Sequence, residues 1–174
     1  MNTEAKMRRI AYLVFVEIIG RGYIFILPVI ALIVSAVQTA ADPGLDRVHV
    51  LLDNLLFYAV YIQGCFSFVG LVFLGKEVAE FAGFDRGDGN FQREVGFVHL
   101  GFAAAGLMAT QFEFFRTIQF WSALIVILFV FKSASAVNHT IEAVRKKNYS
   151  WGNVSMVFNV LVAALMLWLV SLKW

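Results

Sequence analysis

Charged residues and proline are both scarce in this 174-residue chain. Only 15% of its residues are charged and two are prolines, whereas 60% are hydrophobic and 16% are aromatic. A soluble domain is about 25% charged and about 45–50% apolar, so the composition excludes an ordinary soluble enzyme and a disordered chain. The single cysteine excludes a disulfide scaffold. A formal net charge of only +2 provides no broad basic surface, so we expect no nucleic-acid partner.

Long apolar runs are what the chain has instead. A helix needs about 20 apolar residues to cross the hydrocarbon core of a membrane, where irregular backbone cannot face lipid. Five runs meet this length, at residues 10–37, 48–74, 91–110, 117–143 and 152–172. We therefore predict an all-α bundle of five transmembrane helices in the lipid bilayer, forming a single domain over residues 1–174. The short break between the third and fourth runs predicts that these two helices form a tight antiparallel pair.

The positions of Lys and Arg predict the orientation of the bundle, because cytoplasmic loops carry an excess of these residues. The N-terminus and two breaks on one side carry nine of the fourteen, namely Lys6, Arg8, Arg9, Lys76, Arg86, Arg93, Arg145, Lys146 and Lys147. The opposite side carries Arg47, Arg116 and Lys173. This asymmetry predicts a multi-pass protein of the inner (plasma) membrane, with its N-terminus in the cytoplasm and its C-terminus outside.

The outer interface is then expected to hold an aromatic belt, because tryptophan concentrates at the level of the lipid headgroups. Trp121, Trp168 and Trp174 fall at that level. Asp53 and His49 lie near the same boundary, and we expect them to be solvated.

Three ionisable residues fall well inside the predicted membrane. An ionised side chain there costs at least about 2.5–3.5 kcal/mol, so each one needs a partner or a function. With a rise of 1.5 Å per residue, Arg21 and Lys132 both lie about 17 Å from the cytoplasmic boundary. Glu17 precedes Arg21 by four residues, which is the favourable order for an ion pair on one helix face. Two cations and one carboxylate therefore share the inner half of the bilayer.

Further polar residues fall between these charges and the cytoplasmic boundary. On the fourth helix the spacing of three and four residues places Lys132, Ser135, His139 and Glu142 on one face. Neighbouring helices add Gln92, Glu94 and His99 from the third, and Asn153 and Asn159 from the fifth. The pattern indicates either a polar cavity open toward the cytoplasm or a buried hydrogen-bond network.

Two short motifs resemble those of an uncharacterised family of small bacterial inner-membrane proteins, known only as a domain of unknown function. The first is FQREVG at residues 91–96, followed by Leu100-Gly101. The second is His139 late in the next helix, then the basic residues 145–147 and the pair Gly152-Asn153. The resemblance covers roughly residues 75–172. It implies a bacterial inner-membrane protein and singles out Gln92, Glu94, His139, Gly152 and Asn153, but it implies no chemistry.

Three functions remain compatible with these patterns. In the leading hypothesis, the polar cavity binds or conducts a small solute, a proton or an anionic lipid headgroup, with Arg21 and Lys132 attracting the anion. The second hypothesis is a non-catalytic subunit of a larger membrane complex or homo-oligomer. The third is a haem or metal protein that uses His99 and His139 as ligands. Known catalytic motifs such as HExxH and CxxC are absent, so we predict no catalytic residue and expect no cofactor.

Overall fold

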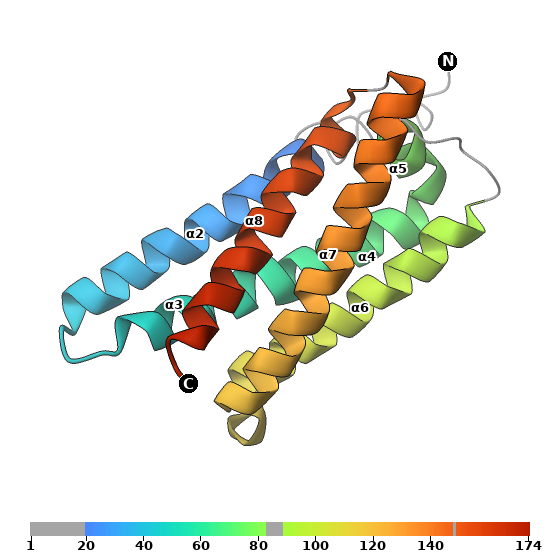
Figure 1. The fold of residues 1–174 in the computed structure, drawn as a ribbon. Coiled ribbons are helices and arrows are strands. Elements are labelled where there is room, and N and C mark those ends of the chain that lie inside the picture. Colours follow the sequence, from blue (N-terminus) through green and yellow to red (C-terminus); the bar gives the residue numbers. More distant parts are fainter. Residues whose placement is uncertain (1–19, 83–88, 148) are drawn as a thin grey trace, which may run out of the picture.

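The structure, a computed structural model, describes residues 20–82, 89–147 and 149–174. Within these ranges the chain forms helices and turns and contains no β-strand, so the all-α expectation is confirmed. The helices, coloured along the chain in Figure 1, are α2 (Gly20–Ala41), α3 (Arg47–Leu55), η2 (Leu56–Ile62), α4 (Gln63–Phe73), α5 (Gly75–Ala82), α6 (Asn90–Gln111), η3 (Glu113–Phe115), α7 (Ile118–Lys146) and α8 (Trp151–Ser171).

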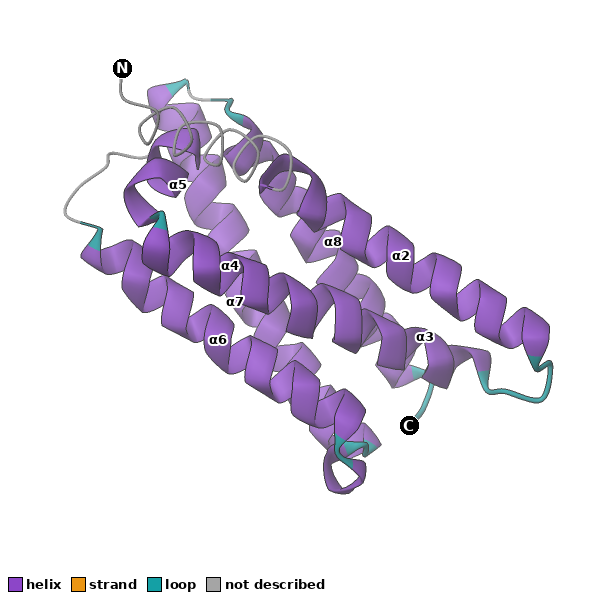
Figure 2. Ribbon diagram, turned by 180° about the vertical axis from the view of Figure 1, so that it is seen from behind, coloured by secondary structure: helices purple, strands orange, loops and turns teal. Residues whose placement is uncertain are grey.

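Five long rods make up the described bundle. They are α2, the continuous run α3–η2–α4, α6, α7 and α8, and consecutive rods run in opposite directions (Figures 1 and 2). One end of the bundle holds the α2–α3 turn, the η3 turn and the C-terminus, and we call it the C-terminal end. The opposite end holds α5, the start of α6 and the connection from α7 to α8, and we call it the α5 end.

Side-chain capping groups mark the start of two helices, α3 and α7. Asp46 precedes α3, and its carboxylate accepts hydrogen bonds from the backbone N–H groups of Val48 and His49. The Thr117 hydroxyl accepts one from Phe120 at the start of α7. At the other end of α7, Lys147 adopts the left-handed conformation, with φ of 51°. The first helix was expected to cover residues 10–37. In the structure α2 ends at Ala41, four residues later than expected, and residues 10–19 lie outside the described part of the chain.

The expected tight pair between the third and fourth helices is not the main packing contact. The two helices, α6 and α7, are antiparallel, but α6 packs chiefly against α4 and η2, and α7 packs chiefly against α8. Glycines explain the preference of α6. A Cβ added at Gly106 would lie 2.8 Å from the backbone nitrogen of Tyr61, and one added at Gly64 would lie 2.9 Å from the carbonyl oxygen of His99. Close backbone approach at small residues is how helices associate in a membrane.

An apolar core fills the bundle toward its C-terminal end. Its members are Ala31, Leu52, Leu55, Leu56, Val60, Phe102, Ala109, Trp121, Leu124, Ile125, Leu128, Met166, Leu169 and Val170. Trp121 is only 1% exposed, and its indole N–H donates to the carbonyl oxygen of Ala109 at 3.0 Å. Its placement in an aromatic belt was therefore wrong, because the indole finds a hydrogen-bond partner inside the bundle. Trp168 and Trp174 are exposed, as the belt requires.

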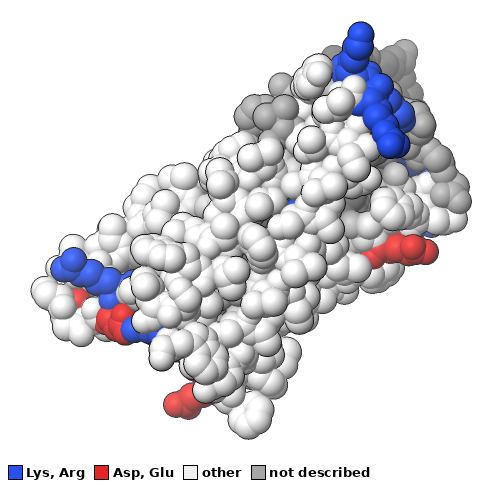
Figure 3. Space-filling model, viewed as in Figure 1, with Lys and Arg blue, Asp and Glu red and all other residues white. Residues whose placement is uncertain are grey.

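The outer surface of the bundle has the composition of a lipid-facing one. Three described helical runs are long and apolar enough to cross a membrane, at residues 22–41, 47–73 and 118–146, and a shorter apolar helix covers Ser155–Ser171. Large hydrophobic side chains such as Ile33, Ile127 and Val130 are exposed on these helices. Figure 3 shows charged side chains gathered toward the two ends of the visible face, with an almost uncharged surface between them. These features indicate a membrane protein.

Candidate functional site

A polar cluster occupies the interior of the bundle between its middle and the α5 end. Buried polar side chains come from α4 (Gln63 and Ser67), α7 (Lys132) and α8 (Asn153, Ser155 and Asn159). Elsewhere in the described chain the buried polar side chains are Ser35 and Thr110, which donate to backbone carbonyl oxygens of their own helices. We call the six buried residues from α4, α7 and α8, together with Tyr23, Ser135, His139 and Met156, the polar cluster.

Lys132 is the charged member of the polar cluster. Its side chain is only 7% exposed. Its Nζ lies 6.0 Å from the centroid of the Phe131 ring, and that ring also packs against His99 on α6, at 5.5 Å. Among the buried polar side chains of the described residues, Lys132 alone makes neither a hydrogen bond nor an ion pair. The ammonium group therefore lies near one aromatic ring and lacks a carboxylate partner among the described residues.

A hydrogen bond between two buried amides crosses the centre of the bundle. The Gln63 amide nitrogen at the start of α4 donates to the Asn159 Oδ1 on α8, at 2.8 Å. Gln63 was missed at the sequence level. Ala59, Gln63 and Ser67 are buried four residues apart and so share one face of the rod, but one glutamine within an apolar run does not show that this face turns inward. The π-helix η2 ends directly before Gln63, and such segments are rare and often lie at functional sites.

Sulfur and hydroxyl groups connect α7 and α8 beside this amide pair. The Ser135 hydroxyl donates to the Met156 Sδ at 3.8 Å, and the Asn159 amide nitrogen donates to the same sulfur at 3.7 Å. Thioether sulfur is a weak acceptor. These contacts therefore position side chains more than they stabilise them.

His139 and Asn153 meet nearer the α5 end. The His139 Nδ1 lies 2.7 Å from the Asn153 Oδ1, and Asn153 is 5% exposed. Because an amide oxygen only accepts hydrogen bonds, the contact places a proton on Nδ1. The hydrogen bond joins the last turns of α7 to the first turn of α8, across the connection between them.

Tyr23 extends the polar cluster to α2 and was also missed at the sequence level. Its hydroxyl lies 3.2 Å from the Ser67 hydroxyl on α4, and its ring contacts Phe66. A tyrosine within an apolar run resembles an ordinary packing residue, so the sequence carried no signal for this contact. Helices α2, α4, α7 and α8 contribute to the cluster, and α6 contributes rings that pack against Phe131 beside Lys132.

The predicted site residues divide into two groups. Within the polar cluster lie Lys132, Ser135, His139, Asn153 and Asn159. The others lie apart from it or outside the described side chains. Glu142 pairs with Lys146 one turn away at 2.6 Å, Glu94 is exposed on α6, and Gln92 is half-buried against Gly75. Glu17 lies outside the described residues, and for Arg21 the structure describes only the helical backbone.

The two histidines proposed as metal or haem ligands occupy different surroundings. His99 packs its ring against Phe102 and Phe131, whereas His139 contacts the amide of Asn153. In the described part of the chain, no group of three or more His, Cys, Asp or Glu residues is arranged to hold a metal ion. The geometry therefore favours hydrogen bonding and ring packing as the roles of these histidines.

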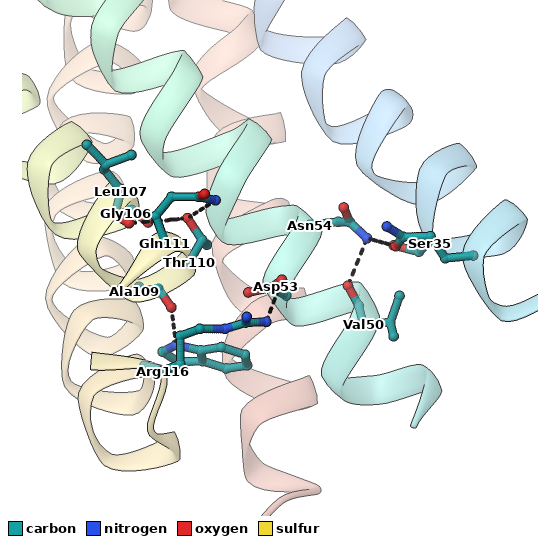
Figure 4. Close-up of polar contacts among 12 residues, drawn as sticks. Ser35, Val50, Asp53, Asn54, Gly106, Leu107, Ala109, Thr110, Gln111 and Arg116 are labelled. Atoms are coloured by element: carbon teal, nitrogen blue, oxygen red, sulfur yellow. Dashed lines mark hydrogen bonds and ion pairs between the residues drawn. The ribbon is translucent and has the colours of Figure 1, made fainter. Parts of the chain in front are cut away.

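At the C-terminal end, Asp53 is half-buried and paired rather than solvated, whereas His49 is exposed, as expected. Arg116 donates to the Asp53 Oδ2 at 3.1 Å (Figure 4), and the Asp53 Oδ1 is buried without a hydrogen-bond partner. The His49 ring stacks on Trp121 at 4.7 Å. In the same region Asn54 donates to the Ser35 hydroxyl, joining α3 to α2 (Figure 4). These contacts join helix ends to one another, and the sequence patterns did not predict these residue pairs.

Comparison with known proteins assigns the chain to a family but not to a function. The profile of one family, described as a family of unknown function (DUF6790), matches residues 21–174. The match confirms the expectation of an uncharacterised family. No curated protein and no solved structure matched the chain.

Proposed function

The chain belongs to the DUF6790 family of unknown function, and we propose that it is a membrane protein that binds a small anionic solute at Lys132. The observation that carries this proposal is the buried ammonium group of Lys132, which has no hydrogen-bond or ion-pair partner among the described residues. An ionisable residue at membrane depth is costly, so it is kept either by a partner or by a function.

The cost of burying the ammonium group, compared with the energy of its cation–π contact, supports a ligand beside Lys132. Burying the ammonium costs at least about 2.5–3.5 kcal/mol, whereas a desolvated cation–π contact returns about 2 kcal/mol. The Phe131 ring lies at the outer limit of that interaction, at 6.0 Å. An anion beside Lys132 would supply the missing stabilisation. Ser135 on the same helix face and the amides of Gln63 and Asn159 provide neutral donors within the same polar cluster.

The location and orientation of the protein follow from its surface and charges. We place it in the inner membrane of a bacterium, with its N-terminus and the α5 end in the cytoplasm. The exposed basic residues Arg93, Arg145 and Lys147 lie at the α5 end. A reporter enzyme that folds only outside the cytoplasm should be active when fused after Trp174, and an inactive fusion of a stably expressed chain would reverse the orientation.

The anion site is tested by ligand-dependent stability. The purified chain in neutral detergent is heated in gluconate, and then in chloride, acetate or phosphate at the same ionic strength and pH. We expect at least one of these anions to raise the Tm, because a ligand at 100 times its Kd stabilises the folded state by about 2.7 kcal/mol. The Lys132→Met variant should lose this rise, whereas Lys147→Met, which removes an exposed lysine from the C-terminus of the same helix, should keep it.

Two outcomes would overturn the proposal. One is a wild-type Tm that does not respond to any of the three anions. The other is a Lys132→Met variant that responds as strongly as the wild type, because the anion would then bind elsewhere on the protein.

A further inference from the structure

A second polar feature lies at the α5 end, outside the polar cluster. It is a surface hollow of about 190 Å³ where α4, α5 and α6 meet. Figure 2 shows α5 turning away from the end of α4 beside the start of α6. The hollow is lined by Leu71, Val72, Phe73, Gly75, Lys76, Gly89 and Arg93.

Two cations line this hollow, and no Asp or Glu is among its lining residues. Lys76 on α5 and Arg93 on α6 both line it, and neither forms an ion pair within the described chain. By contrast, Arg116, Lys146 and Lys173 each pair with a carboxylate. Two positive charges that converge on one hollow provide a binding site for an anion, and Arg and Lys are the residues that bind phosphate groups.

Glycine backbone provides the space between the two cations. Gly89 has a φ of 85°, which an L side chain rarely adopts, and its position beside Lys76 carries no side chain that would fill the hollow. A Cβ added at Gly75 would lie 2.9 Å from the Cβ of Gln92, so α5 joins the end of α4 close to α6 only because this residue is glycine. The turn at Gly75 and the left-handed residue Gly89 therefore shape the hollow.

An apolar aromatic surface runs from the hollow toward the middle of the bundle. Phe73, which lines the hollow, contacts Phe68, and Phe68 contacts Phe97, with ring centroids 6.2 and 5.7 Å apart. Phe73 is 71% exposed and Phe97 is 58% exposed. Phe97 follows Arg93 by one helical turn, so the α6 face changes from charged to aromatic at this level. The two cations suit the headgroup of a lipid, and the exposed rings that follow them along α6 suit its acyl chains.

We propose that the hollow binds the phosphate of an anionic phospholipid through Lys76 and Arg93, with an acyl chain lying along Phe73 and Phe97. The inference rests on the membrane location proposed above but not on the anion site at Lys132. It differs from that site in position, in exposure and in ligand, because its cations are exposed at the membrane surface and its walls continue into an apolar strip.

Lipid selectivity in detergent tests this inference. The purified chain is titrated with phosphatidylglycerol or with phosphatidylcholine, and bound lipid is counted by native mass spectrometry. We expect the wild type to prefer phosphatidylglycerol. The Lys76→Gln/Arg93→Gln variant should bind it about 30-fold more weakly, because each basic residue near an anionic surface contributes about a factor of five. Both side chains are exposed, so the variant should fold.

A matched variant removes the same charge from the same end of the molecule. Arg145→Gln/Lys147→Gln changes two exposed cations that do not line the hollow, and it should keep the lipid preference. Equal losses in both double variants would show a general surface effect and overturn the site. A preference that persists in Lys76→Gln/Arg93→Gln would also overturn it.

Two further arms identify the source of the phosphate and separate the two proposals. Inorganic phosphate should fail to displace the lipid, and displacement at matched concentration would show that the hollow recognises free phosphate instead. Lys132→Met should keep the lipid preference, and Lys76→Gln/Arg93→Gln should keep the anion-dependent Tm. Either proposal therefore stands if the other fails.

Discussion

The two halves of the bundle fill their interiors with different side chains. Toward the C-terminal end the packed residues are hydrocarbon, with Leu52, Leu56 and Ile125 fully buried. Toward the α5 end the same helices bury amides, hydroxyls and an ammonium group. In a bilayer an apolar interior gains little from burial, because lipid is as apolar as leucine, so close packing has to hold that half together. The polar half depends instead on each group finding a partner.

The boundary between the halves coincides with η2. The π-helix separates the apolar residues Leu52 and Leu55 from Gln63 and Ser67 on the same rod. Gly106 lies against the backbone of η2 at both Leu56 and Tyr61, so α6 approaches the rod closely at this wide turn. The same rod thus provides packing on one side of η2 and hydrogen bonding on the other.

Removing the largest buried side chain of the apolar half should have the largest effect. We expect Trp121→Ala to lower the free energy of unfolding by about 3–5 kcal/mol, because it leaves a cavity and deletes the hydrogen bond to Ala109. Trp168→Ala, the same substitution at an exposed position, should change it by less than about 1 kcal/mol. Denaturant titration in detergent measures both. Similar losses at the two positions would mean that packing does not dominate this half.

Alanine at two glycines of α6 should give effects of opposite sign. At Gly106 the new Cβ would meet the backbone of η2, at 2.8 Å from the Tyr61 nitrogen, so we expect a loss of about 1–3 kcal/mol. At Gly101 nothing lies within 4 Å, and alanine should stabilise the helix by up to about 1 kcal/mol. Thermal unfolding of the two variants compares them directly. A tolerated Gly106→Ala would show that the contact at the boundary is looser than the structure places it.

Sequence reasoning succeeded where one physical rule dominates. The length of apolar runs predicted the helical rods, and turn residues such as Asp42 and Gly44 predicted their ends to within a few residues. It failed for Trp121, because the interfacial preference of tryptophan is an average and cannot show that the Ala109 carbonyl is within reach. It also failed for the pairing of α6. The positions of glycines, rather than the short connection to α7, determine which helix packs closely against α6.

The candidate site was predictable only in part. Spacing on one helix placed Lys132, Ser135 and His139 together, because residues three and four apart share a face. The partner groups Gln63 and Tyr23 come from helices far away in sequence, and no local pattern states which face of those helices turns inward. The π-helical turn makes this prediction harder. Its helical period differs from that of an α-helix, so the spacing of residues no longer shows directly which side chains share a face.

Replacing the unpaired cation should stabilise the polar half. In gluconate buffer, Lys132→Met removes an insertion cost of about 2.5–3.5 kcal/mol and a cation–π contact of about 2 kcal/mol, so we expect a net gain of about 1 kcal/mol. Lys147→Met, at an exposed position, should leave the stability unchanged to within about 0.5 kcal/mol. Chemical denaturation of both variants gives the values. A destabilised Lys132→Met would mean that the ammonium group already has a stabilising partner.

The smallest expected effect is the coupling between the two amides that join α4 and α8. We expect Gln63→Met and Asn159→Leu each to destabilise the protein, because each leaves the other buried amide unpaired. The double variant should lose less than the two single losses added together, by about 0.6 kcal/mol and at most about 1.7 kcal/mol, the range found for hydrogen bonds between membrane helices. A double-mutant cycle by denaturant titration measures this term. Strictly additive losses would mean that the amides do not depend on each other, and the polar half would then be held by packing, as the apolar half is.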